Sequence, residues 1–112
     1  MSVKLNNQEW AIVALTAVTA ILHIALGIPS LPDFFGIIFI LNGLGYLALV
    51  AGLYFVPQLA EQRAMIRWAL IGFTAVTIIL YFAFNLPNSL SPLGLFDKVV
   101  EIGMIVLLWM TK

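Results

Sequence analysis

The stretch that decides the fold is WAIVALTAVTAILHIALGIPS, from Trp10 to Ser30. It holds no Asp, Glu, Lys or Arg, and about 20 predominantly apolar residues are enough for an α-helix to cross the hydrocarbon core of a membrane. A secretory signal peptide is the alternative, but its apolar core is only ~7–15 residues long and needs a small-residue cleavage site, which is missing before Pro29. The stretch therefore predicts a membrane-spanning helix.

The same pattern returns as WALIGFTAVTIILYFAFNLPN, from Trp68 to Asn88. Aligned without gaps, the two stretches share the leading Trp, the run TAVT and the Pro near the end. Apolar helices resemble one another by chance, but a shared Trp, TAVT and Pro in one register indicate an internal duplication. We expect two helical hairpins, residues 10–56 and 68–110, related as a parallel repeat.

The composition places the whole chain in lipid. Of its 112 residues 63% are hydrophobic and 9% are charged, with a mean hydropathy of +1.13, whereas soluble domains carry roughly 25% charged residues. Four apolar stretches separated by short loops with Pro, Gly, Ser and Asn cover residues 10–28, 34–56, 64–84 and 92–110. The sequence predicts one all-α domain, residues 1–112, built as a bundle of four transmembrane helices.

Charge and cysteine content exclude several functions. The formal net charge is zero, which argues against nucleic acid as a partner, because such a partner requires a basic patch. The chain has no cysteine, so disulfides, thiolate nucleophiles and Cys-ligated metals are excluded. We also find no nucleophile–base pair, phosphate loop or HExxH motif, and therefore predict no enzymatic activity and no cofactor.

Basic residues predict the orientation in the membrane. One side of the predicted bundle holds four of them, and the opposite side has only Lys98, inside the fourth stretch; the four are Lys4, Arg63, Arg67 and Lys112. The positive-inside rule then places the protein in the cytoplasmic membrane as a multi-pass protein with both termini in the cytoplasm. Five residues are expected to anchor this boundary to the lipid interface: Trp10, Arg63, Arg67, Trp68 and Trp109.

Each predicted helix carries one polar stripe, and the stripes overlap in depth. At ~1.5 Å per residue their main members lie about 8 to 14 Å from the outer ends of the helices. Ionisable groups inside a membrane are costly and mark functional sites. The candidate proton or ion site comprises His23, Asn42, Tyr46, Thr77, Tyr81, Asp97, Lys98 and Glu101.

Plainer interpretations compete with this site. The threonines of both TAVT runs are expected to bond their own helix carbonyls. Lys98 is expected to reach the interface or to pair with Glu101, and His23 alone is typical of a hydrogen-bonded core residue. His23 with Asp97 and Glu101 also resembles a metal site, but no motif sets the ligand spacing, so no metal is assigned.

Three runs carry a family resemblance: LNGLGYLALVAGLY (residues 41–54), TAVTIILYF (74–82) and FDKVVEIGMIVLL (96–108). They resemble an uncharacterised family of small four-helix prokaryotic membrane proteins, a domain of unknown function, over most of the chain. The resemblance implies the four-helix architecture and supplies no activity or site residue. DoxX-like and vitamin-K-reductase-like proteins share that architecture, but the latter require cysteines.

Three functions from different classes remain open. Short loops and small size favour an accessory or oligomer-forming subunit of a larger membrane complex, with the lipid bilayer and other subunits or copies as partners. The polar layer favours proton or cation transport, with Asp97 and Glu101 as the titrating groups. A third possibility is a binder of a quinone, lipid or pigment, held between helices with His23 or Tyr81 as its polar contact.

Overall fold

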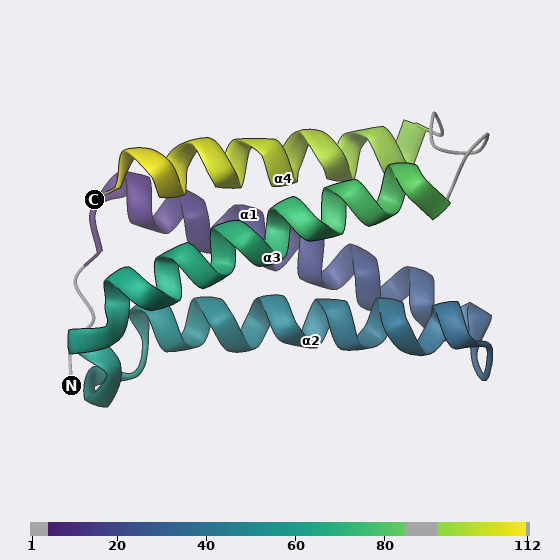
Figure 1. Ribbon diagram of the computed structural model, residues 1–112, viewed down its shortest axis with the longest axis horizontal. Helices are drawn as coiled ribbons and strands as arrows, with labels where there is room; N and C mark the ends of the chain where they lie inside the picture. Colours follow the sequence, from purple (N-terminus) through teal and green to yellow (C-terminus); the bar gives the residue numbers. More distant parts are fainter. Residues whose placement is uncertain (1–4, 85–91, 112) are drawn as a thin grey trace.

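The protein folds into four α-helices in a computed structural model that describes residues 5–84 and 92–111 (Figure 1). The helices are α1 (Asn7–Gly27), α2 (Phe34–Tyr54), α3 (Arg63–Phe84) and α4 (Pro92–Met110). No strand occurs within the described residues. The predicted all-α, four-helix fold is confirmed, and each predicted boundary lies within three residues of the observed one.

The largest boundary error is at the start of α1, which begins at Asn7 rather than Trp10. The Asn6 side chain accepts a 2.8 Å hydrogen bond from the Glu9 backbone N–H, and the Glu9 carboxylate accepts a 3.0 Å bond from the Asn6 backbone N–H. This capping box satisfies two N–H groups that would otherwise lack partners. Apolar content alone misses such a polar first turn, although the spacing of Asn6 and Glu9 is a recognisable sequence signal.

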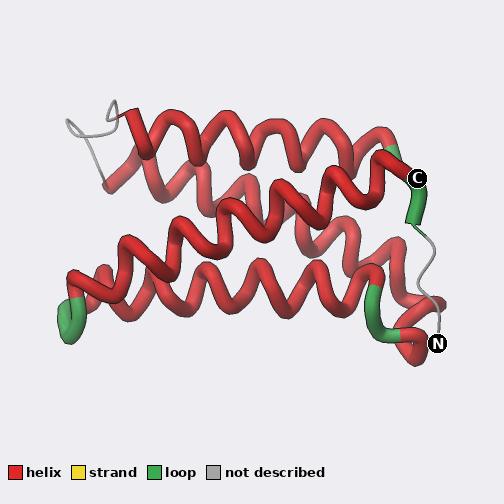
Figure 2. Tube along the Cα trace, turned by 180° about the vertical axis from the view of Figure 1, so that it is seen from behind, coloured by secondary structure: helices red, strands yellow, loops and turns green. Residues whose placement is uncertain are grey.

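Two short 3-10 helices connect the first three α-helices (Figure 2). The first, Ile28–Ser30, follows α1 directly and contains Pro29, and the second, Pro57–Gln62, begins with a proline three residues after the last residue of α2. Proline cannot donate the backbone hydrogen bond that would continue a helix, which explains why both breaks occur there. Asp33 occupies the N-cap position of α2, but its side chain makes no capping hydrogen bond.

The helices form a ring: α1 contacts α2, α2 contacts α3, α3 contacts α4, and α4 contacts α1. The start of α1 and the end of α4 lie at the same end of the bundle, together with the α2–α3 connection (Figure 1). α1 and α2 approach each other most closely. A Cβ atom added to Gly43 would lie 2.6 Å from the Ala20 carbonyl oxygen, and one added to Gly27 would lie 2.7 Å from the Gly36 carbonyl oxygen. Small residues at these points let the two backbones pack together.

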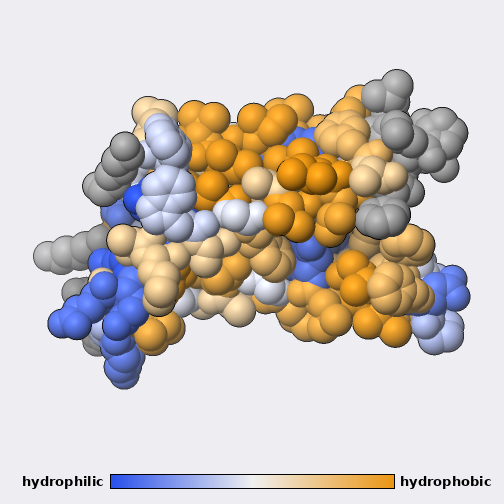
Figure 3. Space-filling model, in the orientation of Figure 1, coloured by the Kyte–Doolittle hydropathy of each residue, from blue (hydrophilic) through white to orange (hydrophobic). Residues whose placement is uncertain are grey.

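The surface along the helices is mainly hydrophobic (Figure 3). Three helical stretches are long and apolar enough to cross a membrane: Asn7–Ser30, Phe34–Tyr54 and Pro57–Ala83. α4 is not among them, because any stretch of 18 of its 19 residues contains Asp97, Lys98 and Glu101. Four membrane spans were predicted, and the structure has three helical stretches that are apolar enough; the fourth helix is of similar length and carries the ionisable groups expected in it.

Candidate functional site

The ionisable residues of α4 are buried inside the bundle. Asp97, Lys98 and Glu101 are 6%, 3% and 0% exposed. The Lys98 ammonium lies 3.2 Å from Asp97 Oδ2 and forms an ion pair with Glu101 Oε1. The expectation that Lys98 pairs with Glu101 is confirmed, and the alternative that it reaches the lipid interface is wrong. With ordinary ionisation this trio carries a net charge of −1.

Thr19 of α1 joins the two carboxylates. Its hydroxyl lies 2.6 Å from Asp97 Oδ1 and 3.0 Å from Glu101 Oε2. A hydroxyl has one proton, so it donates to only one of the two oxygens at a time. Thr19 therefore couples the two carboxylates, because a bond to one leaves the other without this donor.

This contact overturns one interpretation of the TAVT runs. Thr16, Thr74 and Thr77 do donate to the carbonyl four residues earlier, as expected. No such bond is described for the Thr19 hydroxyl, which turns to α4 instead. Thr19 belongs to the site, although it was not among the predicted residues. Its position one turn before His23 on the same stripe was the available signal.

Tyr46 of α2 completes the surroundings of Glu101. Its hydroxyl donates a 2.6 Å hydrogen bond to Glu101 Oε2, and the residue is fully buried. The ring packs edge-on against Phe73 of α3, with 4.8 Å between the ring centroids. α1, α2 and α4 thus all supply a polar contact to one carboxylate, and α3 supplies the aromatic wall.

His23 of α1 faces the same carboxylates. Its Nδ1 lies 2.7 Å from the Thr19 carbonyl oxygen. A carbonyl only accepts, so this contact places a proton on Nδ1. Nε2 lies 3.9 Å from Asp97 Oδ2 and 4.0 Å from Glu101 Oε2, beyond hydrogen-bond distance. Nε2 is therefore the ring nitrogen that has no hydrogen-bond partner among the described residues.

Within residues 5–84 and 92–111, one group of three side chains of metal-ligating type has its ligand atoms within 4.8 Å of one another. The group consists of His23, Asp97 and Glu101. The donor types suit a divalent ion. The Lys98 ammonium, however, already supplies a positive charge to both carboxylates. This internal cation accounts for how two carboxylates can lie buried side by side. The absence of a metal stays a prediction.

Asn42 and Thr77 form a second polar pair, between α2 and α3. The Asn42 Nδ2 donates a 3.1 Å hydrogen bond to Thr77 Oγ1, while the Thr77 hydroxyl donates to the Phe73 carbonyl. Tyr81 lies one turn further along α3, with the Lys98 ammonium 4.7 Å from its ring centroid. The structure therefore brings together all eight predicted site residues.

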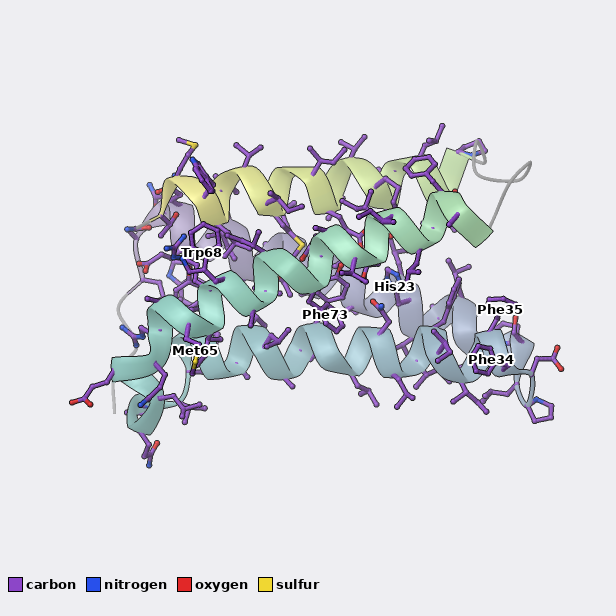
Figure 4. The ribbon with its side chains drawn as sticks, viewed as in Figure 1. His23, Phe34, Phe35, Met65, Trp68 and Phe73 are labelled. Carbon is purple, nitrogen blue, oxygen red and sulfur yellow. The ribbon has the colours of Figure 1, made fainter. Side chains whose placement is uncertain are left out.

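A cavity of about 310 Å³ lies beside the cluster. Most of its wall comes from the aromatic and aliphatic side chains of α2 and α3, and His23 of α1 and Lys98 of α4 reach it from the bundle interior. Its lining residues are His23, Phe34, Phe35, Ile38, Phe39, Asn42, Thr77, Leu80, Tyr81 and Lys98. Figure 3 shows a small hydrophilic area in a hollow between α3 and α2, and Figure 4 shows His23 behind the same gap.

Comparison with family models, curated proteins and solved structures finds no match to this chain. The resemblance to small four-helix prokaryotic membrane proteins stays a prediction.

The sequence did not identify the apolar part of this site. Phe34, Phe35, Ile38, Phe39 and Leu80 line the cavity but are ordinary members of apolar helices. The four on α2 follow one helix face, which also carries Asn42, but the other faces of α2 are apolar as well, so the sequence did not separate the cavity wall from the outer surface. Only the packing of α2 against α3 makes that distinction.

The predicted anchors gather at the other end of the bundle. Trp68 and Trp109 pack edge-on, with 5.5 Å between ring centroids, and the Arg67 guanidinium lies 4.9 Å from the Trp68 ring. Arg67 also donates a 2.9 Å hydrogen bond to the Leu108 carbonyl near the end of α4. Trp10 and Arg63 are exposed at the same end. Arg67 is thus partly a helix-capping residue, and it does not reach Glu101.

Proposed function

We propose that this protein is an integral membrane protein that binds an apolar small molecule in the cavity between α2 and α3. The observation that carries the proposal is a mainly apolar cavity with a few polar groups converging at one side, which is the usual composition of a small-molecule site. Its volume of about 310 Å³ fits one ring system or a short section of a lipid chain.

The membrane setting of the proposal includes all four helices. Lipid surrounds an apolar exterior, and α4 spans as well because its three ionisable groups point into the bundle and satisfy one another there. We place the end with Trp68, Trp109 and Arg67 at the cytoplasmic interface of the cell membrane, with both termini in the cytoplasm. The internal duplication fits this arrangement, since Thr16 and Thr74 are both fully buried and both bond one turn back.

The location of the cavity indicates how a ligand enters. Phe34, Ile38 and Leu80 line it and are also exposed on the outer surface of the bundle. In a bilayer this surface faces lipid. A molecule dissolved in the membrane would therefore enter sideways between α2 and α3, without passing through water.

The test is photolabelling of the purified protein in lipid nanodiscs with a diazirine-bearing alkyl probe, mapped by peptide mass spectrometry. We expect saturable labelling of residues 34–42 and 77–81. Ile38→Trp should fill the cavity and abolish the saturable part. Leu41→Trp, one turn away on the lipid-facing surface, should leave it unchanged. Equal labelling in both variants would show that the cavity binds nothing.

The charged cluster favours proton or cation transport as a second candidate function. The formal charges of Asp97, Lys98 and Glu101 sum to −1, so one added proton or monovalent cation would neutralise this trio in its low-dielectric surroundings. Asp97→Asn combined with Glu101→Gln should then abolish ion flux into proteoliposomes. Unchanged flux in the double variant would reject this candidate.

The role of accessory or oligomer-forming subunit stays a prediction, which co-purification of partner proteins would test.

A further inference from the structure

We propose that the ligand of the cavity carries a hydroxyl group at its polar end, as an alcohol or a phenol does, and is not a molecule with acceptor groups alone, such as an oxidised quinone. This inference rests on the proposed binding function and specifies the chemistry of its ligand. It follows from which polar atoms of the cavity wall already have hydrogen-bond partners.

The orientation of the Asn42 amide is set by its neighbour. The Thr77 hydroxyl donates its single proton to the Phe73 carbonyl, 2.9 Å away, so towards Asn42 this hydroxyl can only accept. The amide group that faces it at 3.1 Å must be the donating Nδ2. Asn42 Oδ1 is consequently the other end of the amide, and it is buried without a hydrogen-bond partner in the described part of the chain.

A buried amide oxygen without a donor is unfavourable, because it has lost its hydrogen bonds to water and gained none in return. Asn42 is part of the cavity wall, but its Oδ1 has almost no accessible surface in this structure. A ligand donor would therefore reach Oδ1 as the side chains around it shift. A hydroxyl or N–H group can supply that donor, whereas an ether, ester or ketone cannot. The unpaired oxygen therefore selects for donors.

His23 provides a second acceptor in the same wall. Its Nδ1 is committed to the Thr19 carbonyl, and its Nε2 makes no hydrogen bond within the described residues. In the neutral tautomer that carries its proton on Nδ1, Nε2 presents a lone pair. A ligand hydroxyl has one proton and can donate it to either of these two acceptors.

The remaining polar groups of the wall are already paired. The Lys98 ammonium contacts Asp97, Glu101 and the face of the Tyr81 ring, and Thr77 both donates and accepts. Tyr81 also has interactions of its own. A ligand with acceptor groups alone would compete for donors that already have partners. A ligand hydroxyl would instead donate to an acceptor that has none, Asn42 Oδ1 or His23 Nε2.

The experiment compares 4-heptylphenol with its methyl ether, 4-heptylanisole, by isothermal titration calorimetry in detergent micelles. The two probes have the same alkyl chain and ring and differ only in the hydroxyl proton and one methyl group. Wild-type protein should bind the phenol roughly five- to tenfold more tightly than the ether, the effect of one net hydrogen bond. Asn42→Leu should bring this ratio down towards one, because one of the two acceptors that distinguish the probes is lost. Comparing the ratio between the two proteins cancels the different partition of each probe into micelles.

A third variant separates orientation from direct contact. Thr77→Val removes the hydrogen bond that holds the amide in place, and should lower the phenol-to-ether ratio while binding of the ether persists. Helix content and unfolding temperature, measured by circular dichroism, identify any variant that has not folded. Equal binding of both probes to wild-type protein, or an unchanged ratio in Asn42→Leu, would overturn the inference on ligand chemistry. Binding of neither probe, together with unsaturable photolabelling, would instead reject the cavity as a binding site.

Discussion

The hydroxyl of Tyr46 in α2 donates a 2.6 Å hydrogen bond to Oε2 of Glu101 in α4, across the interior of the bundle. The two helices are not neighbours in the ring, so this bond connects opposite sides of the molecule. Both residues are fully buried. A bond to a charged group in such surroundings is stronger than one between neutral groups, because water does not compete for it.

Tyr46→Phe should therefore destabilise the fold by about 1.5–3 kcal/mol, the usual contribution of a hydrogen bond to a charged group. The substitution keeps the ring and its contact with Phe73, so packing changes little. Thermal unfolding in detergent, followed by circular dichroism, measures the effect. Tyr54→Phe is the control, since Tyr54 is also buried but makes no side-chain hydrogen bond within the described residues. Equal losses in the two variants would mean that the bond to Glu101 adds nothing.

Lys98 should be needed for the stability of the fold only while the Asp97 and Glu101 carboxylates are both present. Lys98→Met leaves two buried negative charges without their cation, and breaking a buried ion pair in this way costs about 3–5 kcal/mol. The triple variant Asp97→Asn, Lys98→Met and Glu101→Gln removes all three charges and should recover most of that loss, because no unpaired charge remains. Unfolding temperatures of the single and triple variants provide the comparison. A triple variant less stable than Lys98→Met would contradict this account of the cluster.

The sequence predicted most of the fold and the polar part of the site for identifiable reasons. Apolar stretches ended by Pro and Gly located four helices, and helical periodicity placed Asp97 and Glu101 on one face. The pairing of Lys98 with Glu101 followed from their spacing within one helix, whereas partners on other helices were not predictable, because they depend on how helices rotate against one another. Thr19 shows this: its type and spacing match Thr16, Thr74 and Thr77, and only the approach of α4 redirects its hydroxyl. The cavity wall was hidden for the same reason, since apart from Asn42 and two tyrosines α2 consists of apolar residues and glycine.

The close approach of α1 and α2 gives a prediction with a matched control. Gly43→Ala would place a Cβ 2.6 Å from the Ala20 carbonyl oxygen, and rigid backbone cannot move away cheaply. We expect it to destabilise the protein by about 1–3 kcal/mol, as overpacking does elsewhere. Gly72→Ala on α3 meets nothing within 4 Å and should leave stability unchanged or raise it by up to ~1 kcal/mol through helix propensity. Chemical or thermal unfolding of both variants decides the matter, and equal stability would show that α1 and α2 are not packed this closely.

The membrane topology can be tested cleanly because the chain has no cysteine. Single cysteines introduced at Ser30, Gln58 and Thr111 mark the α1–α2 connection, the α2–α3 connection and the end of α4. With four spans and cytoplasmic termini, a membrane-impermeant maleimide should label Ser30→Cys in intact cells, and Gln58→Cys and Thr111→Cys only after the membrane is opened. Gln58→Cys serves as the internal control, because it follows two helices that are apolar enough to span in any case. If Thr111→Cys were labelled from outside while Gln58→Cys was not, α4 would not cross the bilayer. The ionisable cluster would explain that result, since three charged groups in one helix oppose membrane insertion unless the other helices provide partners for them.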